Sequence, residues 1–122
     1  MNIYAFDVDN TLAIPAMTGD DGPIGLEQLI RLKSDGHVIG LNGNWARVVH
    51  YVRGWHNLFS FIGPCGISKG EFLVQLKTYI LADRYVMVGN DIDGVGNIAP
   101  DRDAAKLEGC EFIREKDFKE GL

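Results

Sequence analysis

The sequence predicts an α/β fold, a three-layer sandwich with a mostly parallel central sheet of about five strands. Short apolar runs alternate with amphipathic stretches along the chain, which is the pattern of strands joined by crossover helices. The 122 residues and the apolar content of 46% are those of one soluble globular domain, and no repeat or long linker divides the chain. We therefore expect a single domain spanning residues 1–122.

Five apolar runs are the predicted strands. The first is nearly continuous, as expected for a strand that is buried on both faces of a sheet. The other four are shorter, and turn-forming residues separate them from the predicted helices. The runs are Ile3–Val8, Val38–Leu41, Leu58–Ile62, Tyr85–Val88 and Cys110–Ile113.

Apolar residues at helical spacing predict the intervening helices. The first begins near Pro23, ends at Asp35 and Gly36, and has an apolar stripe of Leu26, Leu29 and Ile30. Asn44 can cap a second helix, which Gly54 ends and whose stripe is Trp45, Val48, Val49 and Val52.

Two further helices are predicted in the second half of the chain. Ser68 and Glu71 form a capping box at the start of one of them. Its inward residues are predicted to be Phe72, Leu73, Leu76, Tyr79 and Ile80. A short helix over Asp101–Glu108 closes at Gly109, and a helical turn is expected after Glu115.

Composition excludes several classes of protein. The net charge of −5 argues against a wide nucleic-acid-binding face, which needs a basic patch. No run approaches the length of a membrane span, and the first residues carry no basic region typical of a secretory signal. The two cysteines lie far apart in the sequence, so we expect reduced thiols, a cytoplasmic location and no membrane partner.

Polar residues gather where the predicted strands end. In an open parallel sheet, ligands bind beyond the carboxyl ends of the strands, so side chains from separate strand ends converge there. Carboxylate and amide oxygens suit Mg²⁺ together with a phosphoryl group, and a lysine would balance the remaining negative charge. The residues expected to converge are Asp7, Asp9, Asn42, Lys69, Asn90 and Asp91.

The segment from Phe6 to Leu12 carries the main motif. Its sequence, FDVDNTL, is a hydrophobic strand end followed by DxDxT, and it resembles the first signature of the haloacid dehalogenase superfamily of phosphatases. A carboxylate can attack phosphorus to form an aspartyl phosphate, and a second acid two residues later can protonate the leaving oxygen. We assign Asp7 as the nucleophile and Asp9 as the general acid and base. The resemblance implies that Thr11 orders the loop.

Two further segments resemble the family's second and third motifs. Asn42 and Gly43 follow the second predicted strand, where the family has a threonine or serine that binds phosphoryl oxygens. An amide can also donate to phosphate, so both residues are candidates for phosphate binding. Lys69 lies near a helix start, as the family's lysine does, and would stabilise the phosphoryl charge.

The fourth motif is expected after the strand Tyr85–Val88. The resemblance implies a metal ligand there: Asp91 is our assignment, with Asn90 as the alternative and Asp93 in support. Downstream, Asp101 begins a segment similar to the family's Asp-x-x-x-Ala-x-x-x-Gly helix and would fill the second acidic position.

The resemblance implies a Rossmann-like fold and a Mg²⁺-dependent phosphomonoester hydrolase. The segments between motifs are too short to fold as a cap domain, so the site should be open. Such capless members act on large substrates, such as phosphoproteins or polynucleotide ends, or form oligomers that shield the site for small molecules. The part from Asp101 to Phe118 is somewhat similar to polynucleotide 3′-phosphatases. The alternative is a weakly active or inactive member of the same fold that binds a metal or a partner, because Asn42 and Asn90 replace residues on which the family usually relies.

Overall fold

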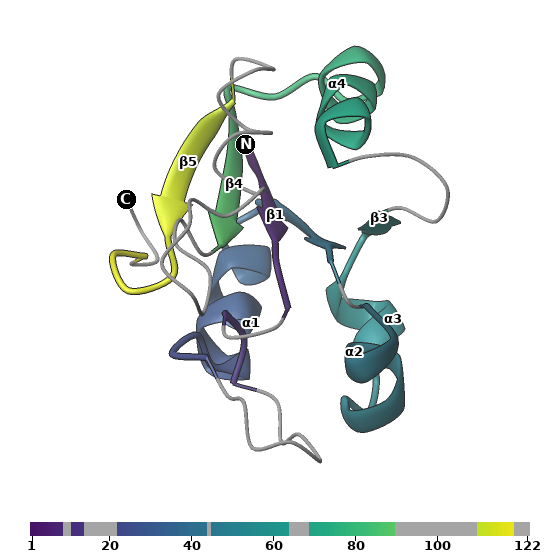
Figure 1. The fold of residues 1–122 in the computed structure, drawn as a ribbon, viewed down its shortest axis with the longest axis vertical. Coiled ribbons are helices and arrows are strands. Elements are labelled where there is room, and N and C mark those ends of the chain that lie inside the picture. Colours follow the sequence, from purple (N-terminus) through teal and green to yellow (C-terminus); the bar gives the residue numbers. More distant parts are fainter. Residues whose placement is uncertain (9–10, 14–21, 44, 64–68, 90–109, 119–122) are drawn as a thin grey trace, which may run out of the picture.

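Five parallel strands form one sheet with β1 at its centre (Figure 1). The computed structural model describes residues 1–8, 11–13, 22–43, 45–63, 69–89 and 110–118. Within these ranges the strand order is β3-β2-β1-β4-β5, which confirms the predicted α/β class. The strands are β1 (Asn2–Phe6), β2 (Val38–Asn42), β3 (Phe61–Gly63), β4 (Arg84–Gly89) and β5 (Glu111–Arg114).

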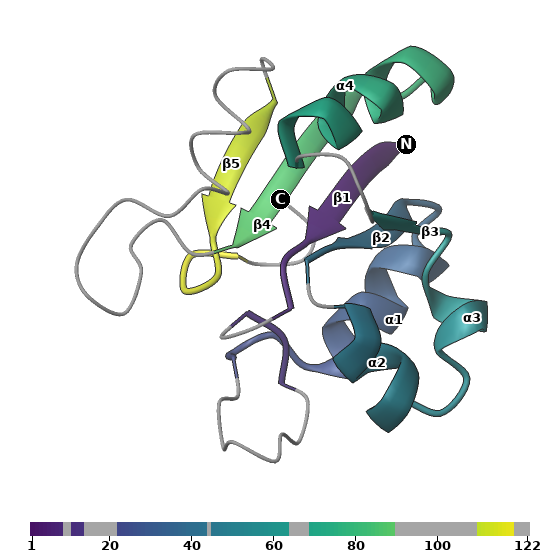
Figure 2. The ribbon, with the colours of Figure 1, turned by 45° about the vertical axis from the view of Figure 1, so that its right-hand side comes forward.

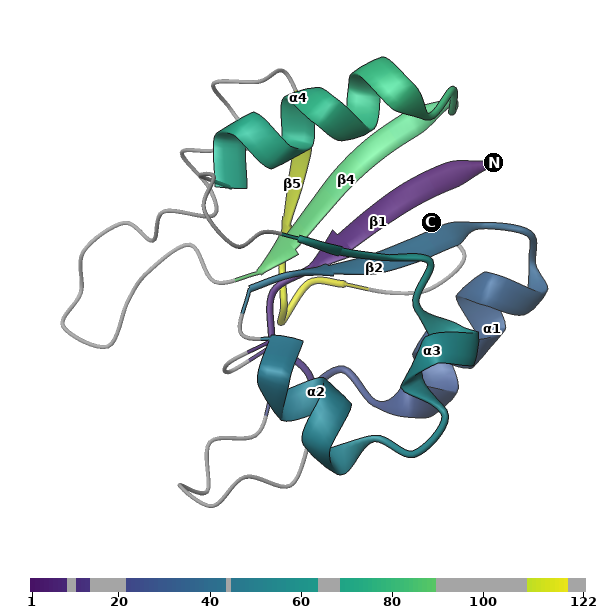
Figure 3. The same cartoon turned by 90° about the vertical axis from the view of Figure 1, so that its right-hand side faces the viewer.

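Helices cover both faces of the sheet and make three layers (Figures 2 and 3). The helices of residues 26–58 lie on one face and the helix of residues 69–79 lies on the other. No second domain or cap occurs among the described residues, and none of their helices is long and apolar enough to cross a membrane. The helices are α1 (Leu26–Ser34), α2 (Trp45–Tyr51), α3 (Trp55–Leu58) and α4 (Lys69–Tyr79).

The central strand β1 supplies side chains to both faces of the sheet, which explains its continuous apolar run. Tyr4 and Phe6 belong to the core cluster that lies under α1. Ile3 and Ala5, which alternate with them, belong to the second cluster, together with Leu73 of α4. Because successive strand residues point to opposite faces, a strand between two helical layers must be apolar at every position.

An aromatic cluster joins the end of the described chain to β1. The Phe118 ring lies edge-on to those of Tyr4 and Phe6, with centroid distances of 6.0 and 5.4 Å. The expected turn after Glu115 is present at residues 115–117, where the Asp117 N–H donates to the Arg114 carbonyl over 2.9 Å. Phe118 is thereby brought back over the sheet face that α1 covers.

The prediction for the third strand was wrong in its boundaries. Leu58 ends the short helix α3, and the strand occupies Phe61–Gly63 instead of Leu58–Ile62. Gly54 has a left-handed backbone conformation, with φ of 77°, and this turn lets a new helix begin directly after α2. Trp55 and Leu58, three residues apart, then pack against the core cluster on one side of that helix.

The predicted apolar stripes of the first two helices are only partly inward. In α1, Leu29 and Leu32 are fully buried, whereas Leu26 and Ile30 are 40% and 53% exposed. In α2, Val49 is exposed as well. The side of α1 that meets the sheet is thus centred between Leu29 and Leu32, and the other two residues flank it.

Tyr79 was also predicted to point inward, but 82% of its surface is exposed. A different tyrosine occupies the end of α4. The Tyr85 hydroxyl donates to the Ile80 carbonyl and accepts from the Ala82 N–H at 3.1 Å. These bonds satisfy backbone groups just beyond the last turn of the helix, where no further helical partner exists. The tyrosine that closes this end of α4 is thus Tyr85, and Tyr79 lies outside the core.

Ion pairs link neighbouring segments at the amino end of the sheet. The chain's terminal ammonium lies 2.6 Å from Asp83 Oδ2, and this hydrogen bond lowers the pKa of the Asp83 carboxyl. The Arg84 guanidinium binds Glu111 through two bonds, Nε to Oε2 at 2.6 Å and Nη2 to Oε1 at 2.8 Å. Hydrogen bonding to Arg84 lowers the pKa of Glu111. These charges lie far from the strand ends where the candidate site was predicted.

Candidate active site

Asp7 follows directly after the central strand β1. At this strand the order in which the chain adds strands to the sheet reverses. The chain builds the sheet from β1 outward through β2 to β3, and then adds β4 and β5 on the other side of β1. Between β1 and β4 the connections therefore diverge, and ligands bind at such switch points. The Asp7 N–H donates to the Val88 carbonyl over 2.9 Å, so the ladder between the two strands holds the backbone of Asp7.

Strand alternation turns Asp7 and Asn42 toward the layer that contains α4. Asp7 is two residues after Ala5, and the registers pair Ala5 with Gly40 of β2 and with Met87 of β4. Asn42 is two residues after Gly40, and its Nδ2 donates to Met87 Sδ at 3.5 Å. In Figure 3, α4 begins at the same end of the sheet at which these strands finish.

The backbone of Gly43 lies directly against the Asp7 carboxylate. A Cβ atom at Gly43 would lie 2.3 Å from Asp7 Oδ1 and 3.3 Å from the backbone nitrogen of Val8. Any side chain at this position would therefore occupy the space beside the carboxylate. Two residues that the sequence predicted to share a site are thus brought into contact by the pairing of β1 with β2.

The Asp7 carboxyl group is largely removed from solvent, with the residue 9% exposed. A carboxylate in such a position is stable as an anion only when hydrogen bonds or positive charge compensate for its lost hydration. Because Gly43 has no side chain, only backbone lies beside the carboxylate on this side. The position suits a nucleophile or a cation ligand.

Two buried side-chain oxygen atoms of the predicted site residues have no hydrogen-bond partner within the described part of the chain. They are Asn42 Oδ1 and Thr11 Oγ1, and both residues are completely buried. An unsatisfied buried acceptor costs free energy, and a ligand or an ion that supplied a partner would remove this cost. The carboxylate oxygens of Asp7 and the amide oxygen of Asn42 are the hard oxygen donors that Mg²⁺ prefers.

The loop that follows Asp7 is held by its backbone. The Thr11 N–H donates to the Val8 carbonyl at 3.2 Å, and the Thr11 carbonyl accepts from the Ile24 N–H at 3.1 Å. A Cβ atom at Gly22 would lie within 2.4 Å of three backbone atoms of Thr11, so only glycine allows this contact. Thr11 is therefore packed between two segments, and its role in ordering the loop stays a prediction.

Several predicted site residues lie outside the described residues. They are Asp9, Asn90, Asp91, Asp93 and Asp101, together with the predicted caps Asn44 and Ser68 and the helix over Asp101–Glu108. Lys69 is the first residue of α4. Among the residues that the structure does describe, no three acidic, histidine or cysteine side chains form a metal-binding group. The Mg²⁺ site stays a prediction.

Two residues of this region were not singled out from the sequence. Met87 supplies the sulfur that accepts the Asn42 amide hydrogen, and Gly22 supports the backbone of Thr11. The alternation of the strand Tyr85–Val88 could have placed Met87 on the same face as Asp7 once the strand register was known. No local pattern distinguishes Gly22 from the other loop glycines.

The fold and the arrangement of the strand ends are described above from this chain alone. Comparison with models of protein families, with curated proteins and with solved structures found no match to this chain.

Proposed function

We propose that this protein is a Mg²⁺-dependent phosphomonoester hydrolase that works through an aspartyl phosphate on Asp7, in an open site without a cap. One observation supports the proposal above the others. The carboxylate that follows the central strand lies against the bare backbone of Gly43 at the switch point of a parallel sheet. The resemblance of residues 6–12 to the DxDxT signature assigns the nucleophilic role to this same carboxylate.

In the proposed reaction, an Asp7 oxygen attacks phosphorus and the bond from phosphorus to the substrate oxygen breaks. Asp9 gives its proton to the departing alcohol. Water then attacks the phosphorus of the aspartyl phosphate and passes its proton to Asp9. The bond between phosphorus and the Asp7 oxygen breaks, so phosphate leaves, Asp7 is again a carboxylate and Asp9 is again protonated. The groups proposed to hold Mg²⁺ are the carboxylates of Asp7 and Asp91 and the backbone carbonyl of Asp9, with Asn90 as the alternative to Asp91. When bound, the ion supplies positive charge that offsets the repulsion between the phosphoryl oxygens and the nucleophile.

The remaining candidates have supporting roles in this proposal. Asn42 and Gly43 would contact the phosphoryl oxygens, and Lys69 at the start of α4 would balance their charge. Thr11 would keep the loop after Asp7 in place, while Asp93 and Asp101 would support the metal ligands. The substrate is a phosphorylated small molecule, a phosphoprotein or a polynucleotide end, and the enzyme is cytoplasmic.

The test compares the wild type with Asp7→Asn in the hydrolysis of p-nitrophenyl phosphate and a broad panel of phosphomonoesters, with and without Mg²⁺. We expect turnover by the wild type to need Mg²⁺ and to be lost in Asp7→Asn. The matched control is Asp35→Asn, which removes an exposed carboxylate at the end of α1 and should leave the rate unchanged. Mass spectrometry of acid-quenched enzyme should find the phosphoryl adduct on the peptide that contains Asp7. Equal activity of the wild type and Asp7→Asn would contradict the proposal.

A second candidate is a non-catalytic module that binds a divalent cation or a partner through the same strand ends. The burial of Asn42 favours it, because the Nδ2 group that would reach a phosphate donates to Met87 in this structure. Calorimetric titration with Mg²⁺ separates the two. Binding that Asp7→Asn abolishes, without turnover of any substrate by the wild type, would favour the module.

A further inference from the structure

A pocket lies between α1 and the segment that joins α2 to α3. It has a volume of about 540 Å³, which lies within the usual range for sites that bind small molecules. These helices cover one face of the sheet, whereas Asp7 is turned toward the layer of α4 on the other. The pocket is thus separate from the candidate active site.

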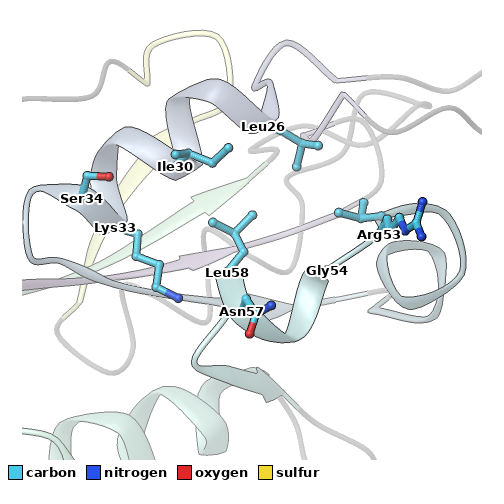
Figure 4. Close-up of a pocket in the computed structure, with 9 residues that line it drawn as sticks. Leu26, Ile30, Lys33, Ser34, Arg53, Gly54, Asn57 and Leu58 are labelled. Atoms are coloured by element: carbon cyan, nitrogen blue, oxygen red, sulfur yellow. The ribbon is translucent and has the colours of Figure 1, made fainter.

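The centre of this pocket is apolar. In Figure 4, the side chains of Leu26 and Ile30 on α1 and of Leu58 on α3 converge on the same space. Val52 also lines it. Leu26 and Ile30 are the two α1 residues predicted to be buried and found to be 40% and 53% exposed. Both side chains therefore offer apolar surface to a ligand in the pocket.

The polar groups around this apolar centre are cationic or neutral. Lys33 and Asn57 lie at one end of the pocket and Arg53 lies at the other (Figure 4). None of the described residues that line it is acidic. Neither Lys33 nor Arg53 forms an ion pair within the ranges that the structure describes. In a chain of net charge −5, two cations that have no acidic partner among the described residues, beside an apolar surface, are a feature that an anion would complement.

We propose that this pocket binds a small organic anion, with its apolar body on Leu26, Ile30 and Leu58 and its carboxylate or sulfonate at the end formed by Lys33 and Asn57. The apolar contacts supply affinity through buried area, and the lysine and the amide select the charge and the orientation of the ligand. The proposal is independent of the phosphatase function, because it uses other residues on the other face of the sheet.

The test uses 1-anilinonaphthalene-8-sulfonate as the probe, because it joins an aromatic body to one sulfonate. N-phenyl-1-naphthylamine has the same body without the charge and serves as the matched neutral probe. We expect one sulfonate probe per chain by calorimetry and by fluorescence, with weaker binding of the neutral probe. Lys33→Gln should raise the Kd of the sulfonate probe about threefold to fivefold and should leave the Kd of the neutral probe unchanged. The control Lys116→Gln removes an exposed lysine from a distant turn and should change neither.

A second pair of variants tests the apolar centre. Ile30→Asp should abolish binding of both probes, whereas Val74→Asp, which alters an exposed valine on α4, should leave binding intact. Circular dichroism and thermal unfolding should show that both variants are folded. Equal affinity for the two probes, or binding unaffected by Lys33→Gln and Ile30→Asp, would overturn the proposal. Sedimentation velocity gives a further check: a wild-type dimer that Ile30→Asp dissociates would show that a second copy covers the pocket, and this too would overturn it.

Discussion

The contact between Gly43 and Asp7 gives the sharpest test of the candidate active site. In Gly43→Ala, the new Cβ would lie 2.3 Å from Asp7 Oδ1, about 1 Å short of the 3.4 Å at which ordinary contact begins. The atom that must move is the end of a short side chain, so rotation of the carboxylate relieves the clash. We expect a loss of about 1 kcal/mol in the free energy of unfolding, as for a side chain held off its preferred rotamer.

The same displacement should be costly for catalysis. A shift of about 1 Å in a reacting group can lower a rate about 100-fold, which corresponds to about 2.7 kcal/mol of activation free energy. We therefore expect kcat/KM for p-nitrophenyl phosphate to fall about 100-fold in Gly43→Ala, mainly through kcat, while the protein stays folded.

The assay is steady-state hydrolysis at saturating Mg²⁺, with urea unfolding of each variant. Gly25→Ala is the matched control, because a Cβ at Gly25 meets no atom within 4 Å and its φ of −90° suits alanine. Gly25→Ala should keep wild-type kcat/KM. If Gly43→Ala also kept it, the carboxylate beside Gly43 would not be the reacting group, and the reasoning from this contact would fail.

Three further predictions concern stability. Gly22→Ala should lower the free energy of unfolding by about 3 kcal/mol in urea titrations, because the new Cβ would clash with the backbone of Thr11, which cannot rotate away. A variant as stable as the wild type would contradict this contact. Phe118→Ala should cost about 3–5 kcal/mol by the same measurement, since it empties an aromatic site that is 6% exposed, and a loss below 1 kcal/mol would show that the ring does not belong to the core. Glu111→Gln should cost about 1 kcal/mol or less near neutral pH, because its pair with Arg84 is exposed. Because hydrogen bonding to Arg84 lowers the pKa of Glu111 in the folded state, the extra stability of the wild type should be complete above pH 4.5, the ordinary value. It should disappear as the pH falls through the lowered pKa. Extra stability that persisted in acid would refute the ion pair as its source.

The elements of the fold could be predicted because each depends on a local pattern. The continuous apolar run at Ile3–Val8 predicts a strand covered on both faces, and β1 is the central strand of the sheet. The position of Asp7 after this run is likewise local information. The third strand was misplaced because a left-handed glycine at position 54 allowed a short helix where the apolar residues also fitted a strand.

The amino-acid sequence by itself determined the α/β class, the order of the described elements and the residues that stand at the strand ends. Only the tertiary structure decided which of these residues touch. Local periodicity says nothing about strand order, and the contact between Gly43 and Asp7 arises because β2 pairs with β1 in a particular register. The exposure of Leu26 and Ile30 was decided in the same way. The packing of α1 on the sheet buries Leu29 and Leu32, and the two residues left outside line the pocket beside α3.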